Sequence, residues 1–254
     1  MEWAYWLIGG FLALAFGSFL NVAIYRLPLR VLYPDQDLNL LYPPSHCPKC
    51  KIALNWRDNI PVISWLLLQG KCRHCQCVIP LRYFYVEIFT AFGTLLLVWL
   101  FPVSMRLIAV LILFWALLTL SIIDVDHFLL PDAITLPLLW LGLLCKAVEW
   151  IPGLLSEAVL GAIAGYLLLL VLSEIYQWVK GIPALGMGDM KLMAAMGSWL
   201  GLPLLPYVLL AASAGGILFV LISRIGWQRE LYQPFAFGPF ISLAAISLFI
   251  HSII

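Results

Sequence analysis

The sequence predicts an all-α polytopic membrane protein with about eight transmembrane helices and a small cytoplasmic, zinc-ribbon-like segment. Of its 254 residues, 64% are hydrophobic and 11% are charged, whereas a soluble domain has roughly 45–50% apolar and about 25% charged residues. The mean hydropathy is +1.02. Such a chain cannot cover a soluble globule with polar groups. The net charge of +1 gives no electrostatic reason to expect a nucleic-acid partner.

Long uncharged stretches predict the spans, because a helix needs about 20 apolar residues to cross a hydrocarbon core roughly 30 Å thick. Residues 3–25 form the first span, and they do not read as a cleavable signal peptide because basic residues follow them rather than precede them. Residues 192–223 would reach about 48 Å as one helix, so we expect a break at Gly201-Leu202-Pro203. If the short piece before Gly201 does not cross, the spans number seven. The other expected spans are 83–101, 106–123, 133–150, 156–179, 190–201, 203–224 and 235–253.

Basic residues predict which side of the membrane each loop faces. Eight of the 14 Lys and Arg lie in residues 26–82, and short loops rich in Lys and Arg stay in the cytoplasm. The chain therefore divides into a first transmembrane helix (1–25), a cytoplasmic segment (26–82) that we expect to bind zinc, and a transmembrane bundle (83–254).

Four of the six cysteines form two C-x-x-C pairs, Cys47/Cys50 and Cys72/Cys75. Two such pairs at this separation are typical of a tetrahedral structural zinc site. Disulfides are the weaker interpretation in a reducing cytosol, and a redox C-x-x-C or incidental thiols remain alternatives. Metal binding would supply about 10 kcal/mol of folding free energy to a segment with little core. We do not expect the remaining cysteines and the nearby histidines to bind the metal, although Cys77 could be a fifth thiol ligand; these residues are Cys77, Cys145, His46 and His74.

Two aspartates mark the ends of predicted spans on the same side of the membrane. Asp124 ends the third span, and Asp189 closes Gly186-Met-Gly-Asp two spans later. A carboxylate pair near water suits aspartyl hydrolysis, in which one carboxylate takes a proton from water and the other, protonated, polarises the scissile carbonyl. Gly186 and Gly188 would let the backbone approach a substrate strand.

Each of these carboxylates also has a plainer interpretation. Asp189 can form an ion pair with Lys191, and Asp126 and His127 can be loop residues. Asp132 after Pro131 is well explained as a first-turn acid that the helix dipole stabilises.

Taken together, the motifs resemble those of the type IV prepilin peptidases, also called prepilin leader peptidase/N-methyltransferases. These are G-x-G-D intramembrane aspartyl proteases of bacterial type IV pilus and type II secretion systems. The matching motifs are FGSFLNVAIYRLP at 16–28, both cysteine pairs, Asn59-Ile-Pro61, Gly70-Lys-Cys72, Arg82-Tyr83 with Glu87, Ile123-Asp124 to Leu130-Pro131-Asp132, and Gly186-Met-Gly-Asp189.

The resemblance implies an activity and its residues. Asp124 and Asp189 would cut the basic leader from prepilins or pseudopilins at the cytoplasmic face of the bacterial inner membrane. The enzyme would then methylate the new N-terminal residue with S-adenosylmethionine, in the cytoplasmic segment. For that cofactor we expect Gly70, Lys71 and Glu87, although Glu87 can also be a helix-end acid paired with Arg82.

Two alternatives remain open. A peptidase that has lost methylation is disfavoured by the intact cysteines. A zinc-ribbon-bearing transporter or channel would need charges near the bilayer midplane and repeat symmetry. The carboxylates lie at the ends of the predicted spans and no repeat is visible in the sequence.

Overall fold

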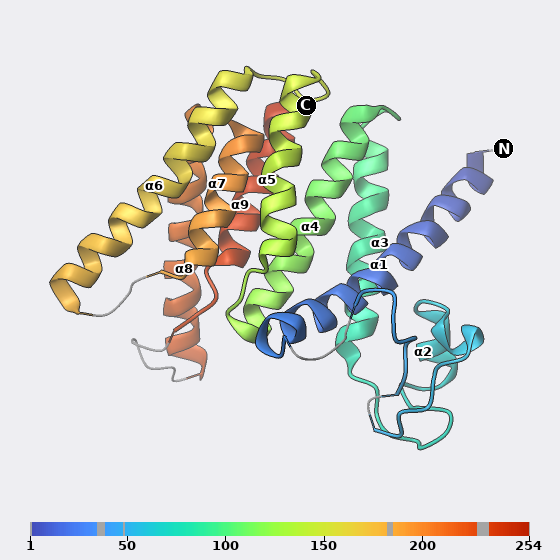
Figure 1. Ribbon diagram of the computed structural model, residues 1–254. Helices are drawn as coiled ribbons and strands as arrows, with labels where there is room; N and C mark the ends of the chain where they lie inside the picture. Colours follow the sequence, from blue (N-terminus) through green and yellow to red (C-terminus); the bar gives the residue numbers. More distant parts are fainter. Residues whose placement is uncertain (1, 35–38, 48, 182–184, 228–233, 254) are drawn as a thin grey trace. The chain divides into compact units, whose positions relative to one another are not determined.

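The computed structural model describes residues 2–34, 39–47, 49–181, 185–227 and 234–253 (Figure 1). It divides into two compact units, residues 1–107 (unit 1) and 108–254 (unit 2), which are taken separately. The described residues are mainly helical, and their only β pairing consists of two isolated bridges. The predicted all-α class is confirmed.

Unit 1 is built on two packed helices, α1 (Glu2–Leu32) and α3 (Leu81–Leu100). The segment between them contains the 3₁₀ turn η1 (Trp56–Asn59) and the short helix α2 (Ile63–Leu67). Helix α1 continues beyond residue 25, where the predicted span ends, because a charge limits the hydrophobic stretch but not the helix. The buried Arg26 guanidinium donates to the carbonyls of Asn39 at 2.8 Å and Pro43 at 2.6 Å. Arg26 therefore ties the following loop to α1.

Helices α1 and α3 approach closely at Gly17. A Cβ atom there would lie 2.8 Å from the Cα of Glu87, so only glycine permits this approach. One turn further along α1, Asn21 Nδ2 donates to the carbonyl of Tyr83 at 3.0 Å. The two helices are antiparallel, because the residue numbers of the contacts decrease along α3 as they increase along α1.

Unit 2 contains nearly all of α4 (Met105–His127), then α5 (Asp132–Ala147), α6 (Leu155–Lys180), α7 (Met187–Leu200), the 3₁₀ turn η2 (Leu202–Leu204), α8 (Leu205–Trp227) and α9 (Gly238–Ile253). The predicted break at Gly201-Leu202-Pro203 is confirmed, since α7 ends and α8 begins on either side of it. Residues 192–200 of α7 are all buried. A helix that is apolar all round belongs in the centre of a bundle.

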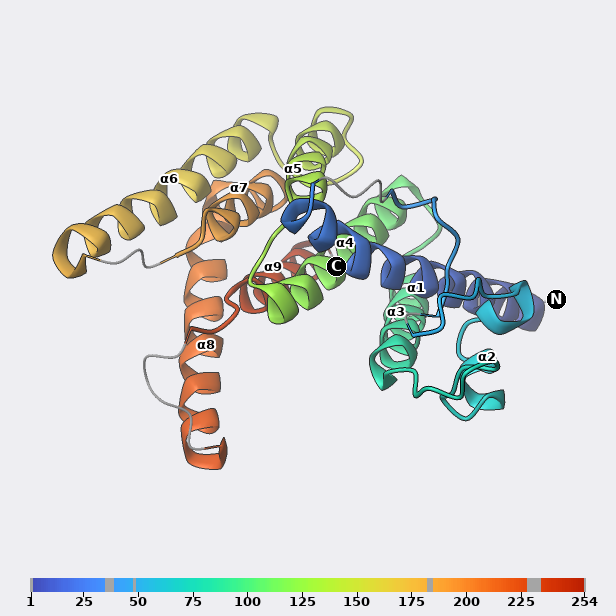
Figure 2. The ribbon, with the colours of Figure 1, turned by 60° about the horizontal axis from the view of Figure 1, so that its bottom comes forward.

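Three neighbours hold α7. Figures 1 and 2 both show α6 running beside it, and a Cβ at Gly161 of α6 would lie 2.5 Å from the carbonyl oxygen of Gly197. Small residues allow such close backbone packing between apolar helices. Trp199 Nε1 donates to the Leu138 carbonyl of α5 at 2.9 Å, and its ring packs edge-on against Phe249 of α9. The first turn of α7, which carries Asp189, therefore begins a well-packed helix.

All eight predicted long helices occur, but not all reach spanning length. Among the described residues, five helices are long and apolar enough to cross a membrane: Trp6–Leu32, Leu81–Leu100, Met105–His127, Leu155–Lys180 and Leu202–Ile225. The apolar α9 has 16 residues, as does α5, and α7 has 14. Fourteen residues rise about 21 Å, less than the core thickness. The chain is a multi-pass membrane protein.

Candidate active site and metal centre

Asp124 lies in the last turn of α4 and is 5% exposed. Its Oδ2 accepts the backbone N–H of Gly238, the first residue of α9, at 2.8 Å. This N–H is available because the first amides of a helix have no intrahelical acceptor. A Cβ at Gly238 would lie 2.7 Å from the same oxygen, so a larger residue would force the carboxylate or the start of α9 to shift. Sequence reasoning missed Gly238, although glycine before Pro239 at a helix start was a readable signal.

Asp189 lies in the first turn of α7, in the same unit. Its Oδ1 is buried and has no hydrogen-bond partner in the described chain, while the Gly186 backbone bonds to its carboxylate. The structure brings the two predicted aspartates close enough to interact electrostatically. The Asp124 carboxylate is thus oriented by a helix N-terminus, and the Asp189 carboxylate has one oxygen with no partner in the part of the chain that the structure describes.

The two glycines of the G-x-G-D motif differ in their surroundings. A Cβ at Gly188 would lie 2.9 Å from the Cβ of Leu130, so packing of α7 against the α4–α5 connection explains this glycine. The nearest atom to a Cβ at Gly186 is Asp189 Oδ2, at 3.6 Å. The expectation that substrate backbone approaches the motif therefore fits Gly186 and not Gly188.

The described contacts test the alternative interpretations, in which Asp189 pairs with Lys191 and Asp126 and His127 are loop residues. Lys191 Nζ lies 2.8 Å from both carboxylate oxygens of Asp132, so Lys191 pairs with Asp132 rather than with Asp189. Asp126 and His127 are exposed, but they belong to the last turn of α4 and not to a loop. The α4 helix extends beyond the predicted span because polar residues can continue a helix past the apolar stretch.

The four paired cysteines come together in unit 1. The sulfur atoms of Cys47, Cys50, Cys72 and Cys75 all lie within 4.8 Å of one another. A tetrahedral zinc shell with metal–sulfur bonds of about 2.3 Å has sulfurs about 3.8 Å apart, and Cys47 Sγ lies 3.7 Å from Cys75 Sγ. Hydrogen bonds, that from the Cys50 backbone N–H foremost, lower the pKa of the Cys47 thiol to about 6. The pKa of the Cys50 thiol is instead raised to about 11, so without a metal the thiols do not all favour the thiolate. The cluster could hold a metal ion.

The described residues at the two C-x-x-C pairs repeat the same backbone hydrogen bonds, 25 residues apart. Lys51 N–H donates to the Cys47 carbonyl at 2.9 Å, and Gln76 N–H donates to the Cys72 carbonyl at 3.0 Å. Lys51 and Gln76 both have positive φ, 60° and 57°. The bridges His46–Ala53 and Lys71–Val78 close the two turns in the same way. This short repeat escaped the sequence analysis because its shared side chains are few.

The equivalence of the two turns explains Cys77. The N–H of Cys72 donates to the Cys77 carbonyl, just as the N–H of Cys47 donates to the Ile52 carbonyl. Cys77 therefore occupies the position of Ile52, and its sulfur lies 3.4 Å from Cys47 Sγ. The group of four sulfurs that suits a metal does not include it.

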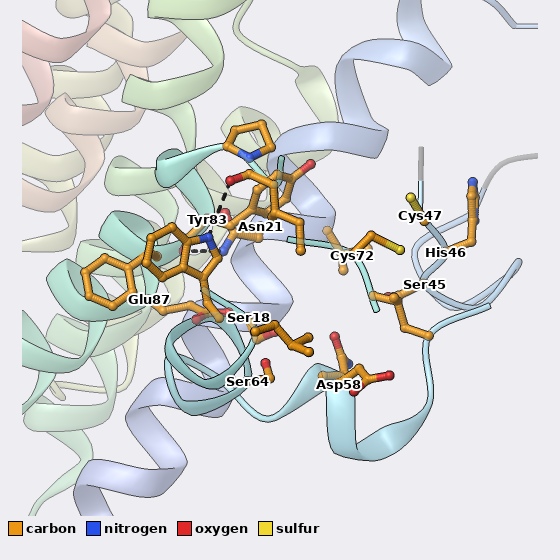
Figure 3. A pocket seen from close by; sticks show the side chains of 18 of the residues that line it. Ser18, Asn21, Ser45, His46, Cys47, Asp58, Ser64, Cys72, Tyr83 and Glu87 are labelled. Carbon is orange, nitrogen blue, oxygen red and sulfur yellow. Dashed lines mark hydrogen bonds between the residues drawn. The ribbon is translucent and has the colours of Figure 1, made fainter. Parts of the chain in front are cut away.

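The three residues predicted to bind the cofactor lie in different surroundings. Gly70 has a φ of +67° and a Cβ there would lie 2.7 Å from the Trp65 ring, so the turn itself explains this glycine. Lys71 is exposed. Glu87 is buried, accepts the Val62 N–H at 2.7 Å and lines a pocket of about 200 Å³ in unit 1 (Figure 3). Gly70 and Lys71 are not among the residues that line this pocket.

Comparisons with known proteins cover nearly the whole chain. The family model for the bacterial peptidase A24 N-terminal domain matches residues 11–101, and that for the type IV leader peptidase family matches residues 111–221. The chain is 41% identical to the prepilin leader peptidase/N-methyltransferase of Pectobacterium carotovorum subsp. carotovorum, covering 93% of this chain and 90% of the relative. It is 38% identical to the protein of the same name from Aeromonas salmonicida, over 96% and 90% of the two chains. No solved structure matches.

Proposed function

Because the chain belongs to the type IV leader peptidase family, we propose that it cleaves the leader peptide of prepilins or pseudopilins and N-methylates the new N-terminal residue. The names of its relatives describe both reactions, and the chain covers about nine-tenths of each relative. The proposal is supported by the location of Asp124 and Asp189 in the same unit, close enough to interact electrostatically.

The cleavage step assigns a role to each aspartate. Asp124, oriented by the Gly238 N–H, takes a proton from the attacking water. Asp189 keeps its proton and donates a hydrogen bond to the carbonyl oxygen of the scissile peptide, through the carboxyl group whose Oδ1 has no partner among the described residues. The tetrahedral intermediate then collapses, and the leaving amine receives the proton that Asp124 took.

The methylation step belongs to unit 1 in this proposal. Zinc bound by the four cysteines would order the segment without taking part in chemistry, because four sulfurs close its coordination shell. S-adenosylmethionine supplies the methyl group when bound. The ammonium group of the new N-terminus must lose a proton before it can attack, and Glu87 is a carboxylate in the pocket that can accept one. Gly70 and Lys71 stay proposed cofactor residues, without support from the pocket.

The proposed orientation has the cysteine segment and both aspartates on the cytoplasmic side of a bacterial inner membrane. The concentration of basic residues in 26–82 supports it. The basic leader would then remain in the cytosol while the apolar part of the pilin lies in the bilayer. We keep residues 1–25, 26–82 and 83–254 as the functional division.

Mass spectrometry of a prepilin incubated with the purified protein and S-adenosylmethionine in detergent tests the proposal. We expect loss of the leader and a gain of one methyl group, and neither product with Asp189→Asn. Leader loss without methylation in the wild type would favour the peptidase-only alternative. A prepilin from the same organism that stays uncut would contradict the proposal and favour the transporter class.

A further inference from the structure

A buried hydrogen-bond acceptor without a donor lines the pocket of unit 1. Asn21 is 4% exposed, and its Oδ1 has no partner among the described residues. Its Nδ2 donates to the Tyr83 carbonyl at 3.0 Å. Because a carbonyl can only accept, this bond fixes which amide atom faces α3. Burying a carbonyl oxygen without a hydrogen-bond donor costs folding free energy. We therefore expect a bound molecule to supply the donor to Asn21 Oδ1.

A second acceptor, the Glu87 carboxylate, lines the same pocket. Gly17 meets Glu87 across the helix contact, and Asn21 meets Tyr83 one turn away. Asn21 and Glu87 are therefore separated by about one helical turn, roughly 5.4 Å along the axis. Figure 3 shows both side chains at the pocket. The protein donors to Glu87 are the Val62 N–H and the Ser18 hydroxyl.

The rest of the lining suits a cation with an apolar body. Aromatic rings form part of the wall, among them Trp65 and Phe84, whose ring centroids lie 5.0 Å apart. Aromatic faces attract cations, and a carboxylate with an amide oxygen accepts from an ammonium group. Arg26 also lines the pocket, and its guanidinium donates to two backbone carbonyls but keeps its positive charge. The Glu87 carboxylate in the same lining offsets that charge.

We propose that this pocket binds a primary ammonium group carried by an apolar ligand, through Asn21 Oδ1 and the Glu87 carboxylate. The inference rests on the proposed function, in which two molecules carry such a group. One is the leader-free pilin, whose new N-terminus is an ammonium. The other is the methyl donor, whose methionine part has an amino group. Asn21 is then a binding residue for one of the two molecules that take part in methyl transfer.

Binding is measured first, without turnover, by saturation-transfer NMR on the full chain in detergent. The probes are leucinamide, which has a primary ammonium, and N-acetylleucinamide, which does not. We expect leucinamide to bind and N-acetylleucinamide not to bind. Asn21→Leu, which keeps the size of the side chain but removes the acceptor, should weaken the affinity for leucinamide at least about tenfold. Thr90→Val is the matched control, because Thr90 is buried on α3 and bonds only its own helix; this variant should bind as the wild type does.

Kinetics then identify the source of the ammonium. Initial methylation rates are measured with leader-free pilin and S-adenosylmethionine varied in turn. A raised KM for pilin in Asn21→Leu would identify the pilin N-terminus, and a raised KM for the donor would identify its amino group. Either result supports the ammonium site, and an unchanged KM for both overturns it.

Equal binding of the two probes, or wild-type affinity in Asn21→Leu, would also overturn the proposal. If Asn21→Leu does not fold, Glu87→Gln decides, since glutamine keeps an oxygen for the Val62 N–H but loses the charge; unchanged affinity there counts against the site. A wild type that binds leucinamide selectively but never methylates pilin would sink the proposed methylation and leave the ammonium site standing.

Discussion

The aspartate site of unit 2 and the cysteine cluster of unit 1 differ in how much buried structure surrounds them. In unit 2, residues 192–200 are buried without a gap beside Asp189, and a helix N-terminus orients Asp124. In unit 1, the described residues from 39 to 80 contain only four buried positions, namely Cys47, Pro61, Gly70 and Cys72. Two of these four are cysteines of the cluster. Packing orders the carboxylates, whereas the described part of the cysteine segment has almost no core, so under our proposal a metal bound by its sulfurs would order it.

The largest effect that separates the two sites should come from the aspartates. We expect Asp124→Asn and Asp189→Asn each to lower leader cleavage by about 10³-fold or more. Methylation of leader-free pilin and metal content should stay within about twofold of the wild type, because unit 1 is untouched. Mass spectrometry measures both products. Asp132→Asn, which removes only the exposed ion pair with Lys191, serves as the control. Normal cleavage by Asp124→Asn would point to Asp126 instead.

A second prediction concerns unit 1, where a substitution should lower methylation and leave leader cleavage largely intact. Cys72→Ser should release the metal and lower methylation by about 10²-fold, because the segment loses what orders it. Cleavage by unit 2 should fall by less than about tenfold. Elemental analysis, hydrogen exchange over residues 39–80 and the two activities together check this. A full complement of metal in Cys72→Ser would contradict the four-sulfur site.

A third prediction concerns the helix end that orients Asp124. Gly238→Ala places a Cβ 2.7 Å from Asp124 Oδ2, so the carboxylate or the start of α9 must shift. Since a displacement of about 1 Å can cost about 10²-fold in rate, kcat for cleavage should fall by that order, with methylation unchanged. Gly9→Ala is the control, because beyond the neighbouring backbone of its own helix no described atom lies within 4 Å of the added Cβ. Wild-type kcat in Gly238→Ala would show that this contact does not matter.

The smallest effect is expected at Cys77. Because this position corresponds to Ile52 of the other turn, Cys77→Ile should keep the metal content of the wild type and change methylation by less than about threefold. Metal per chain is the direct measurement. A drop to half or less would mean that Cys77 is a ligand after all.

Much of this architecture could be predicted from local signals. Uncharged stretches located the eight helices, and Gly201 with Pro203 located the break before α8. The C-x-x-C spacing selected the four sulfurs that come together. These features follow from the chain over a few residues. Lengths were less certain, because helices such as α1 and α4 continue through polar residues that end the apolar stretch.

The features that escaped prediction depend on distant parts of the chain. Gly238 bonds Asp124 across 114 residues of sequence, and Asn21 acquires its role only when α1 packs on α3. The sequence places both Asp189 and Asp132 as candidate partners of Lys191, and in the structure Lys191 forms its ion pair with Asp132. No periodicity or motif spacing reports such choices, since they arise from helix packing.

The bond between Gly238 and Asp124 also has a consequence for the order of synthesis. The ribosome adds roughly 5–20 residues per second, so Asp124 is made on the order of ten seconds before the amide that orients it. Until α9 has been translated and has joined the other helices, the nascent protein holds its two aspartates without this support. If this bond contributes about 10²-fold to kcat, as predicted for Gly238→Ala, we expect the nascent enzyme to cleave correspondingly slowly until α9 has joined the other helices.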